Sequence, residues 1–280
     1  MSNFQTQVHS LKGRFVELPR DHVYAFVVEL EKSVVVVDST LALSSSQELR
    51  TLAETFNKPI DSVIMTHGHP DHYSGLDTFK DLPILGSKGC LKFAHEEDIR
   101  KAPTATYLLG NDWPAIRTFP NEIISDTYTK IFDGVQFSFQ DFGPGESDSD
   151  GIWSFKADGI EHVFVGDLIS NHTHNFFMDG HTNEWLKILD YIIKTYNHHT
   201  RFYYGHGEPT IGTDLALWTK GYIMTFIDAV KKLQNPKFPL SEANQQFLIN
   251  EMKTYLPNDV LLFLMTYELS ECVENFIKKI

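Results

Sequence analysis

Cysteine is scarce in this chain. Among 280 residues only Cys90 and Cys272 occur, and neither belongs to a Cys-x-x-Cys pair. Such sparse and distant cysteines argue against the disulfide framework of a secreted protein, so we expect two buried free thiols in a reducing compartment.

Long apolar runs are missing as well. No stretch approaches the roughly 18 uninterrupted apolar residues of a membrane-spanning helix, and residues 1–13 lack an apolar core of signal-peptide length. We therefore expect no membrane span, and a cytoplasmic location is the simplest expectation.

Positive charge is in deficit. The chain has 24 Lys and Arg against 37 Asp and Glu, which gives a formal net charge of −13. Because such a surface repels phosphate backbones and anionic lipid headgroups, we expect a small-molecule substrate and neither a nucleic-acid nor a membrane partner. The sequence leaves open whether the chain forms a homodimer.

Several catalytic motifs are absent. The sequence contains no Gly-x-Ser-x-Gly elbow, no P-loop and no complete dinucleotide-binding fingerprint, and neither cysteine lies near a histidine motif that follows a strand. These absences argue against a serine or cysteine nucleophile and against a nucleotide cofactor.

The residues that are present fit a globular α/β protein, with 42% hydrophobic and 22% charged residues. Strand-like and helical patterns mix up to about residue 210, and only helical patterns follow. We expect one domain over residues 1–210 and a helical C-terminal extension over residues 211–280.

Alternation, apolar spacing and turn residues predict the individual elements. Strands are expected at 15–18, 23–30, 33–37, 62–65, 84–86, 130–139 (a hairpin turning at 133–134), 152–157, 162–165 and 202–204. Helices are expected at 44–57, 71–80, 96–100, 185–196, 215–233, 241–255 (capped by Ser241) and about 259–280. Residues 101–127 contain three prolines and are predicted to be irregular, either as a lid or binding loop or as a packed surface excursion.

Residues 67–72 read His-Gly-His-Pro-Asp-His and concentrate three imidazoles and one carboxylate. These are ligand types that suit zinc and similar divalent cations. The apolar run 62–65 precedes them, so the cluster follows a buried strand, where open α/β sheets place ligands. It offers two pairs, His67 with His69 and Asp71 with His72.

This H-x-H-x-D-H pattern after an apolar strand resembles the signature of the metallo-β-lactamase superfamily of metallohydrolases. The resemblance covers about residues 15–210. It implies an α/β fold, a four-layer αβ/βα sandwich with metal ions at one edge between two sheets, and leaves the helical extension outside the shared motifs.

Two later segments match further motifs of that superfamily. Asp167 follows the apolar run 164–165 and Gly166, and His206 lies between two glycines after residues 202–204. On this resemblance Asp167 bridges two cations, and His206 completes the second site with Asp71 and His72.

Glu146 departs from the family pattern, because residues 144–146 read Pro-Gly-Glu where relatives commonly carry Pro-Gly-His. Glu146 either completes the first site with His67, His69 and Asp167, or that site is weak or empty and a mononuclear centre remains. Asp148 and Asp150 are alternative ligands. A carboxylate here makes the cation a poorer Lewis acid and weakens the case for zinc over manganese or iron.

Other polar residues are assigned by the same reasoning. Asp38 resembles the aspartate that, in this superfamily, holds the free ring N–H of a histidine ligand. The alternative is that Asp38 is a turn residue at the end of a strand. His172 and His174 are predicted to be surface-loop residues, with substrate contact as the alternative. His95 and His162 are predicted to lie on the surface.

The expected chemistry is metal-dependent hydrolysis of a small ester, thioester, lactone or related substrate. Two divalent cations, with zinc as the first expectation, are expected to supply a bound hydroxide at neutral pH. The family resemblance implies that Asp71 also accepts or donates a proton. An iron-dependent oxidoreductase or dioxygenase and a non-catalytic metal-binding protein stay open. Residues 101–127, residues 168–184 and the C-terminal extension are expected to form the pocket walls. For the extension two alternatives stay open: it covers an edge of the sandwich, or it contacts a second copy of the chain.

Overall fold

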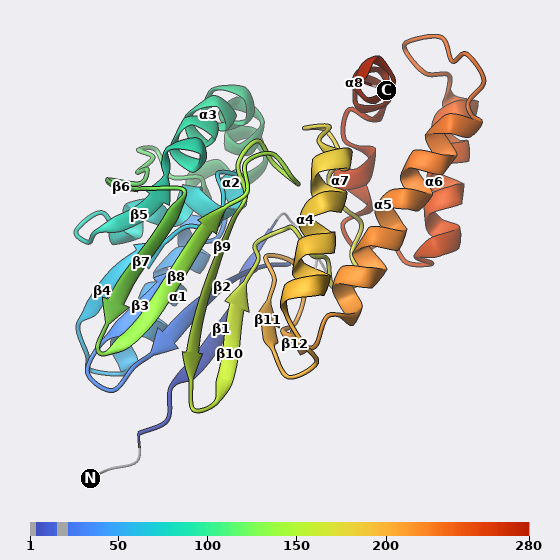
Figure 1. Cartoon of the computed structure of the whole chain (residues 1–280). Coiled ribbons are helices and arrows are strands. Elements are labelled where there is room, and N and C mark those ends of the chain that lie inside the picture. The colour runs from blue at the N-terminus through green and yellow to red at the C-terminus, as the bar shows by residue number, and fades with distance from the viewer. Residues whose placement is uncertain (1–3, 16–21, 280) are drawn as a thin grey trace.

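Two β-sheets packed face to face form the centre of the molecule (Figure 1). The computed structural model describes residues 4–15 and 22–279. Within these ranges the first sheet has the strand order β1-β2-β3-β4-β5-β6, and the second has the order β12-β11-β10-β9-β8-β7. The strands of the first sheet are β1 (Gln7–Arg14), β2 (His22–Glu29), β3 (Val34–Val37), β4 (Ile60–Ile64), β5 (Ile84–Ser87) and β6 (Glu122–Ile124). Those of the second are β7 (Thr127–Phe132), β8 (Val135–Asp141), β9 (Gly151–Ala157), β10 (Ile160–Phe164), β11 (Arg201–Tyr203) and β12 (Thr210–Ile211).

Helices cover the outer face of each sheet. The first sheet carries α1 (Leu43–Thr55), α2 (Pro70–Tyr73), the 3₁₀ helix η1 (Ser74–Phe79) and α3 (Lys88–Leu109), with a further 3₁₀ turn, η2 (Gly110–Asp112), after it. The second sheet carries α4 (Thr182–Thr195) and α5 (Asp214–Lys232). The resulting helix–sheet–sheet–helix order confirms the predicted αβ/βα sandwich.

Aromatic side chains fill the layer between the sheets. Phe26, Phe137, Trp153 and Phe164 are all buried there. The Trp153 indole N–H donates to the Met65 carbonyl at 2.9 Å, which ties the second sheet to the end of β4. This tie places the loops that follow strands of both sheets at one edge of the sandwich.

Strand direction explains why several loops share that edge. β3, β4, β5 and β6 run parallel, and β10 runs parallel to β11 in the other sheet. Because the carboxyl ends of parallel strands lie at the same edge, the loops after β4, β10 and β11 come together.

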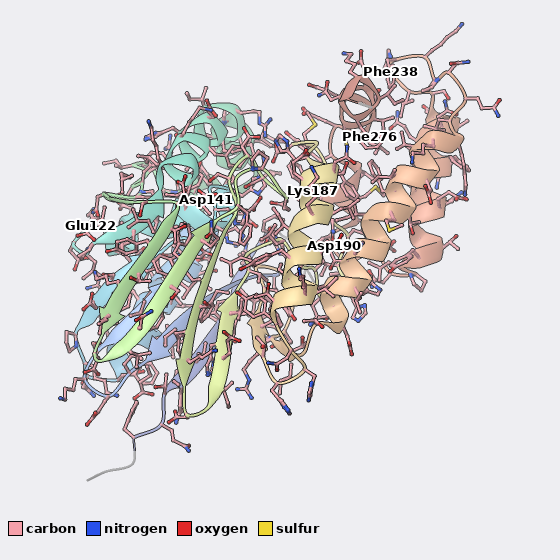
Figure 2. All side chains as sticks on the ribbon, viewed as in Figure 1. Glu122, Asp141, Lys187, Asp190, Phe238 and Phe276 are labelled. Carbon is pink, nitrogen blue, oxygen red and sulfur yellow. The ribbon has the colours of Figure 1, made fainter. Side chains whose placement is uncertain are left out.

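The chain after β12 is helical, as predicted. Figure 1 shows α5 between α4 and the next helix, α6 (Glu242–Tyr255), and the Ser241 side chain caps α6 by accepting from the Asn244 N–H. α7 (Leu262–Thr266) and α8 (Leu269–Lys279) end the chain. Figure 2 shows Phe238 and Phe276 among these outer helices and Asp190 on α4, where it forms an ion pair with Lys220 of α5. The division at residue 210 stays a prediction.

One predicted helix and one predicted irregular segment are wrong. α3 extends to Leu109 and contains Pro103, so much of the segment predicted to be irregular is helical. Ala105 and Leu109 pack in a cluster with Leu41 and Leu261, and such tertiary packing stabilises a helix that its proline disfavours. At the chain end, the single helix predicted over 259–280 divides because Glu268 has φ of +46°.

The start of the chain also differs from the prediction. Residues 16–18 of the strand predicted at 15–18 lie outside the described residues, and the structure has a strand that was not predicted, β1 over Gln7–Arg14. β1 is rich in polar residues and lies at the sheet edge, so its pairing with β2, not its own hydrophobicity, makes it a strand.

His162 is buried, so its prediction as a surface residue is wrong. The residue is 4% exposed, its ring stacks on Phe155 at 4.6 Å between centroids, and Nδ1 forms a hydrogen bond with the Tyr203 hydroxyl at 2.8 Å. Burial lowers the pKa of His162 to about 4, which keeps the imidazole neutral. Both cysteines are buried as expected, and the Cys272 thiol donates to the Phe177 carbonyl.

None of the helices within the described ranges combines the length and the apolar character that crossing a membrane requires.

Candidate metal centre

Four loops at one edge of the sandwich bring the predicted ligands together. Residues 67–72 follow β4, Glu146 lies in the loop between β8 and β9, Asp167 follows β10, and His206 follows β11. The position matches the expectation that the cluster lies at the C-terminal end of a buried strand. The side chains are buried or nearly so, with His67 1% and Glu146 3% exposed.

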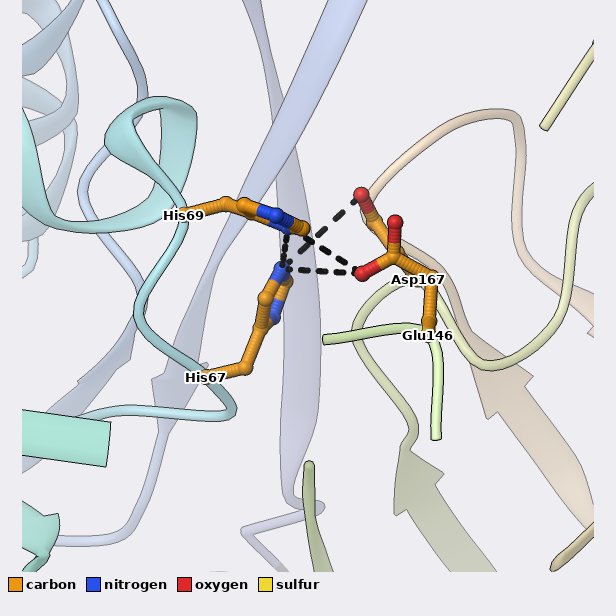
Figure 3. A group of neighbouring side chains, drawn as sticks. All are labelled: His67, His69, Glu146 and Asp167. Carbon is orange, nitrogen blue, oxygen red and sulfur yellow. Dashed lines mark hydrogen bonds and ion pairs between the residues drawn. The ribbon is translucent and has the colours of Figure 1, made fainter. Parts of the chain in front are cut away.

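The first group consists of His67, His69, Glu146 and Asp167, whose ligand atoms all lie within 4.8 Å of one another (Figure 3). His69 Nδ1 lies 3.1 Å from His67 Nε2 and 3.1 Å from Glu146 Oε2. His67 Nε2 lies 3.9 Å from Asp167 Oδ2. The glutamate thus reaches the position that the resemblance gives to a third histidine.

The second group consists of Asp71, His72, Asp167 and His206. His206 Nε2 lies 3.1 Å from Asp71 Oδ2 and 3.3 Å from Asp167 Oδ2, while His72 Nε2 lies 3.4 Å from Asp167 Oδ1. Asp167 is the residue that the two groups share. A carboxylate with two oxygens is suited to that position.

Close approach at the second group depends on Gly205. A Cβ atom at this position would lie 1.9 Å from Asp167 Oδ1 and 2.6 Å from His72 Cε1. Only glycine therefore lets the end of β11 lie so near the shared carboxylate.

The residues fit divalent cations. Four buried atoms that face the groups make no hydrogen bond within the described part of the chain: His72 Nε2, Glu146 Oε2, Asp167 Oδ1 and His206 Nε2. Leaving buried polar atoms without hydrogen-bond partners is costly, unless another species satisfies them. Imidazole nitrogens and carboxylate oxygens arranged in this way suggest divalent metal ions, and the role of each residue as a ligand stays a prediction.

Electrostatics within the groups favour the metal-binding forms of two residues. Burial lowers the pKa of His67 well below its usual value, so this imidazole is neutral. Burial would raise the pKa of Asp167, but His206 and His72 hold it well below the usual range, so this carboxylate is ionised. Against the burial that lowers it, the Asp167 carboxylate raises the pKa of His206 to about 10, and a cation would take the place of that proton.

Outer partners orient the histidines. Asp38 accepts from His72 Nδ1 at 2.9 Å and from the Thr66 hydroxyl at 2.7 Å, the position that the resemblance implied. His206 Nδ1 donates to the His22 carbonyl at 2.8 Å. Each contact leaves the other ring nitrogen directed at the groups, which fixes the tautomer.

Asp179 is a site residue that the sequence reasoning missed. Its carboxylate accepts from His69 Nε2 at 2.9 Å and from Arg100 at 3.1 Å, and its side chain is 3% exposed. Burial would raise the pKa of Asp179, but the bond from His69 holds it well below its usual value. No strand-end glycine or histidine spacing precedes this residue, so the sequence carried no motif for it.

Asp179→Asn should weaken cation binding at the first group by about 10- to 100-fold. The amide keeps the shape but removes the charge that holds His69 with Nδ1 toward the group. Metal affinity is measured by competition with a chromogenic chelator. Asp148→Asn is the matched control, because Asp148 is 44% exposed and pairs with His181 instead. Equal affinities in both variants would refute this role for Asp179.

The two alternative carboxylates do not replace Glu146. Asp148 contacts His181 at 2.6 Å, and Asp150 accepts from the Ser147 N–H at 2.8 Å. Neither belongs to the two groups found among the described residues. Of the three acidic residues in this loop, Glu146 is therefore the one placed to act as a ligand.

His174 contradicts its prediction as a surface-loop residue, whereas His172 is exposed as expected. His174 is 1% exposed, accepts the Tyr222 hydroxyl at Nδ1 (2.6 Å) and donates from Nε2 to the Asn258 carbonyl (2.9 Å). It therefore connects the loop after Asp167 to the C-terminal helices, a role that local sequence cannot reveal.

Comparison with known proteins agrees with this fold. Residues 18–206 match a family model described as "Metallo-beta-lactamase superfamily". A search of curated proteins finds no match. Among solved structures, the chain is similar to a metallo-beta-lactamase from Pontibacter korlensis, with TM-score 0.60, 16% identity, and coverage of 80% of this chain and 96% of the other. A metallo beta lactamase from Hirschia baltica has TM-score 0.58, 17% identity, and coverage of 78% and 93%. At these identities the two structures speak for the fold alone.

Proposed function

This chain belongs to the metallo-beta-lactamase superfamily, and on that premise we propose that it is a metal-dependent hydrolase of a small ester, thioester or lactone. The observation that carries the proposal is the pair of ligand groups sharing Asp167. Divalent cations held there would activate water as the nucleophile and stabilise the negative charge that develops on the substrate oxygen.

The roles of the chain's own residues follow from their positions. In this proposal His67, His69 and Glu146 would hold one cation, Asp71, His72 and His206 would hold the other, and Asp167 would serve both. Asp71 also lines the cavity above the groups, so its carboxylate is placed to hold a proton during the reaction. Zinc is the first expectation for both positions, while the Glu146 carboxylate keeps manganese and iron open.

Removal of metal is the direct test of this proposal. The protein is stripped with a chelator, reloaded separately with zinc, manganese or iron, and assayed on ester, thioester, lactone, phosphodiester and sulfate substrates. We expect turnover of acyl substrates that disappears on stripping and returns on reloading. Absence of metal-dependent turnover across the panel would leave a non-catalytic metal-binding protein.

An iron-dependent oxidoreductase is the second candidate, and Glu146 is the observation that favours it. Carboxylate ligands suit iron and manganese better than zinc. Elemental analysis of protein purified without added metal separates the two candidates. Iron together with oxygen consumption would overturn the hydrolase proposal.

A further inference from the structure

A cavity of about 180 Å³ lies directly above the two ligand groups. His69, Asp71, Glu146, Asp167 and His206 lie on its floor, so anything bound in it touches the reacting centre. Its walls come from two directions. α3 provides Thr104, Ala105, Leu108 and Leu109, and the C-terminal helices provide Phe263, Leu264 and Tyr267.

The walls are apolar and in part fixed. Phe176 is 8% and Leu109 is 7% exposed, and the Phe263 ring packs against Phe15 at 5.6 Å between centroids. Burying apolar substrate surface against such walls is favourable, because it removes that surface from water. The apolar side chains of the walls therefore favour an apolar group on the part of the substrate that contacts them.

The charges around the cavity disfavour an anionic group. Lys101 is the one lysine or arginine among the described residues that line it, and it already forms an ion pair with buried Glu97. Its ammonium also lies over the Phe176 ring, 4.5 Å from the centroid. Arg100 nearby is likewise paired, with Glu97 and Asp179. A carboxylate or phosphate on the distal part of a substrate would thus meet no uncommitted cation along these walls.

The wall formed by α7 is anchored from the loop that follows Asp167. The His174 N–H donates to the Val260 carbonyl at 2.9 Å, and His174 Nε2 donates to the Asn258 carbonyl at 2.9 Å. These bonds set the start of α7 relative to the ligand groups. Because residues 258–267 lie beyond the family match at 18–206, this wall is a property of the extension.

We propose that the acyl part of the substrate is an uncharged apolar chain or ring that lies between α3 and α7, with its carbonyl at the ligand groups. The inference rests on the proposed hydrolase function and adds its substrate class. It also gives the C-terminal extension a role, since Phe263, Leu264 and Tyr267 decide which acyl groups fit.

The test compares 4-nitrophenyl esters of acetate, butyrate, octanoate, phenylacetate and the anionic succinate on the metal-loaded enzyme. Each methylene that becomes fully buried raises kcat/KM by up to about fourfold, so octanoate should exceed acetate by at least about tenfold. Succinate should be the poorest substrate. Equal rates along the series, or a preference for succinate, would overturn the proposal.

A second experiment narrows the cavity. Leu108 is 49% exposed and lines the cavity, so Leu108→Trp should lower kcat/KM for octanoate by about tenfold or more relative to kcat/KM for acetate. Leu217→Trp is the matched control, because Leu217 is 54% exposed on α5 and does not line the cavity. Equal loss for both esters in Leu108→Trp would contradict a role in acyl selection.

Binding to metal-free protein separates failure of the inference from failure of the proposed function. Methyl ketones with butyl, hexyl and octyl chains are titrated calorimetrically, without any turnover. Tighter binding with chain length, lost in Leu108→Trp, supports the apolar acyl site even if no ester is hydrolysed. Binding that is independent of length refutes the site whatever the esters show.

Discussion

Asp167→Ala should remove both cations and lower kcat/KM by at least about 10³-fold. Asp167 is the residue common to both ligand groups, with His206 at 3.3 Å and His72 at 3.4 Å. Bound cations contribute several kcal/mol to transition-state stabilisation, and each 1.36 kcal/mol corresponds to about a factor of ten in rate. No other single residue within the described ranges belongs to both groups.

Metal content by elemental analysis is the primary measurement for Asp167→Ala, and circular dichroism establishes that the fold is intact. Asp190→Ala is the matched control, because Asp190 is an exposed aspartate on α4 whose partner is Lys220 (Figure 2). Loss of only one cation in Asp167→Ala would show that this carboxylate does not bridge the two positions.

Glu146→Ala should lower metal content from two cations to one per chain and reduce kcat/KM by about 10²-fold. Glu146 belongs to the first group only, so Asp71, His72, Asp167 and His206 would remain to hold the other cation. Burial raises the pKa of Glu146, because this position disfavours an uncompensated negative charge.

Glu146→His distinguishes a ligand role from a structural one. Histidine keeps a metal-binding group at this position without the extra negative charge, so two cations should return, with selectivity shifted from manganese toward zinc. Retention of both cations by Glu146→Ala would mean that Glu146 is not a ligand.

Prediction and structure agree most closely at the candidate ligands. All seven predicted residues lie in the two groups, because each follows a strand or occupies a motif position, and the loops after these strands of both sheets meet at one edge of the sandwich. Asp179 and His174 escaped prediction because their roles depend on contacts with residues far away in the sequence. His69 is 110 positions from Asp179, and Asn258 is 84 positions from His174.

The same distinction holds for the secondary structure. The hairpin at residues 133–134 and the Ser241 cap were predictable, because turn and capping preferences act over a few residues. β1 and the α3 segment around Pro103 were not, because pairing with β2 and packing against Leu41 and Leu261 outweigh their local preferences.

The sequence alone thus predicted much of the strand and helix pattern and the candidate ligands, since apolar periodicity and short motifs record interactions between close neighbours, and the resemblance carried by those motifs implied the family and its sandwich. Only the tertiary structure decided that Glu146, not Asp148 or Asp150, reaches the first group, that Asp179 holds His69, and that α7 forms one apolar wall of the cavity above both groups. These outcomes depend on where separate loops and helices meet, and that meeting is set by burial of the two sheets and the C-terminal helices as one packed unit.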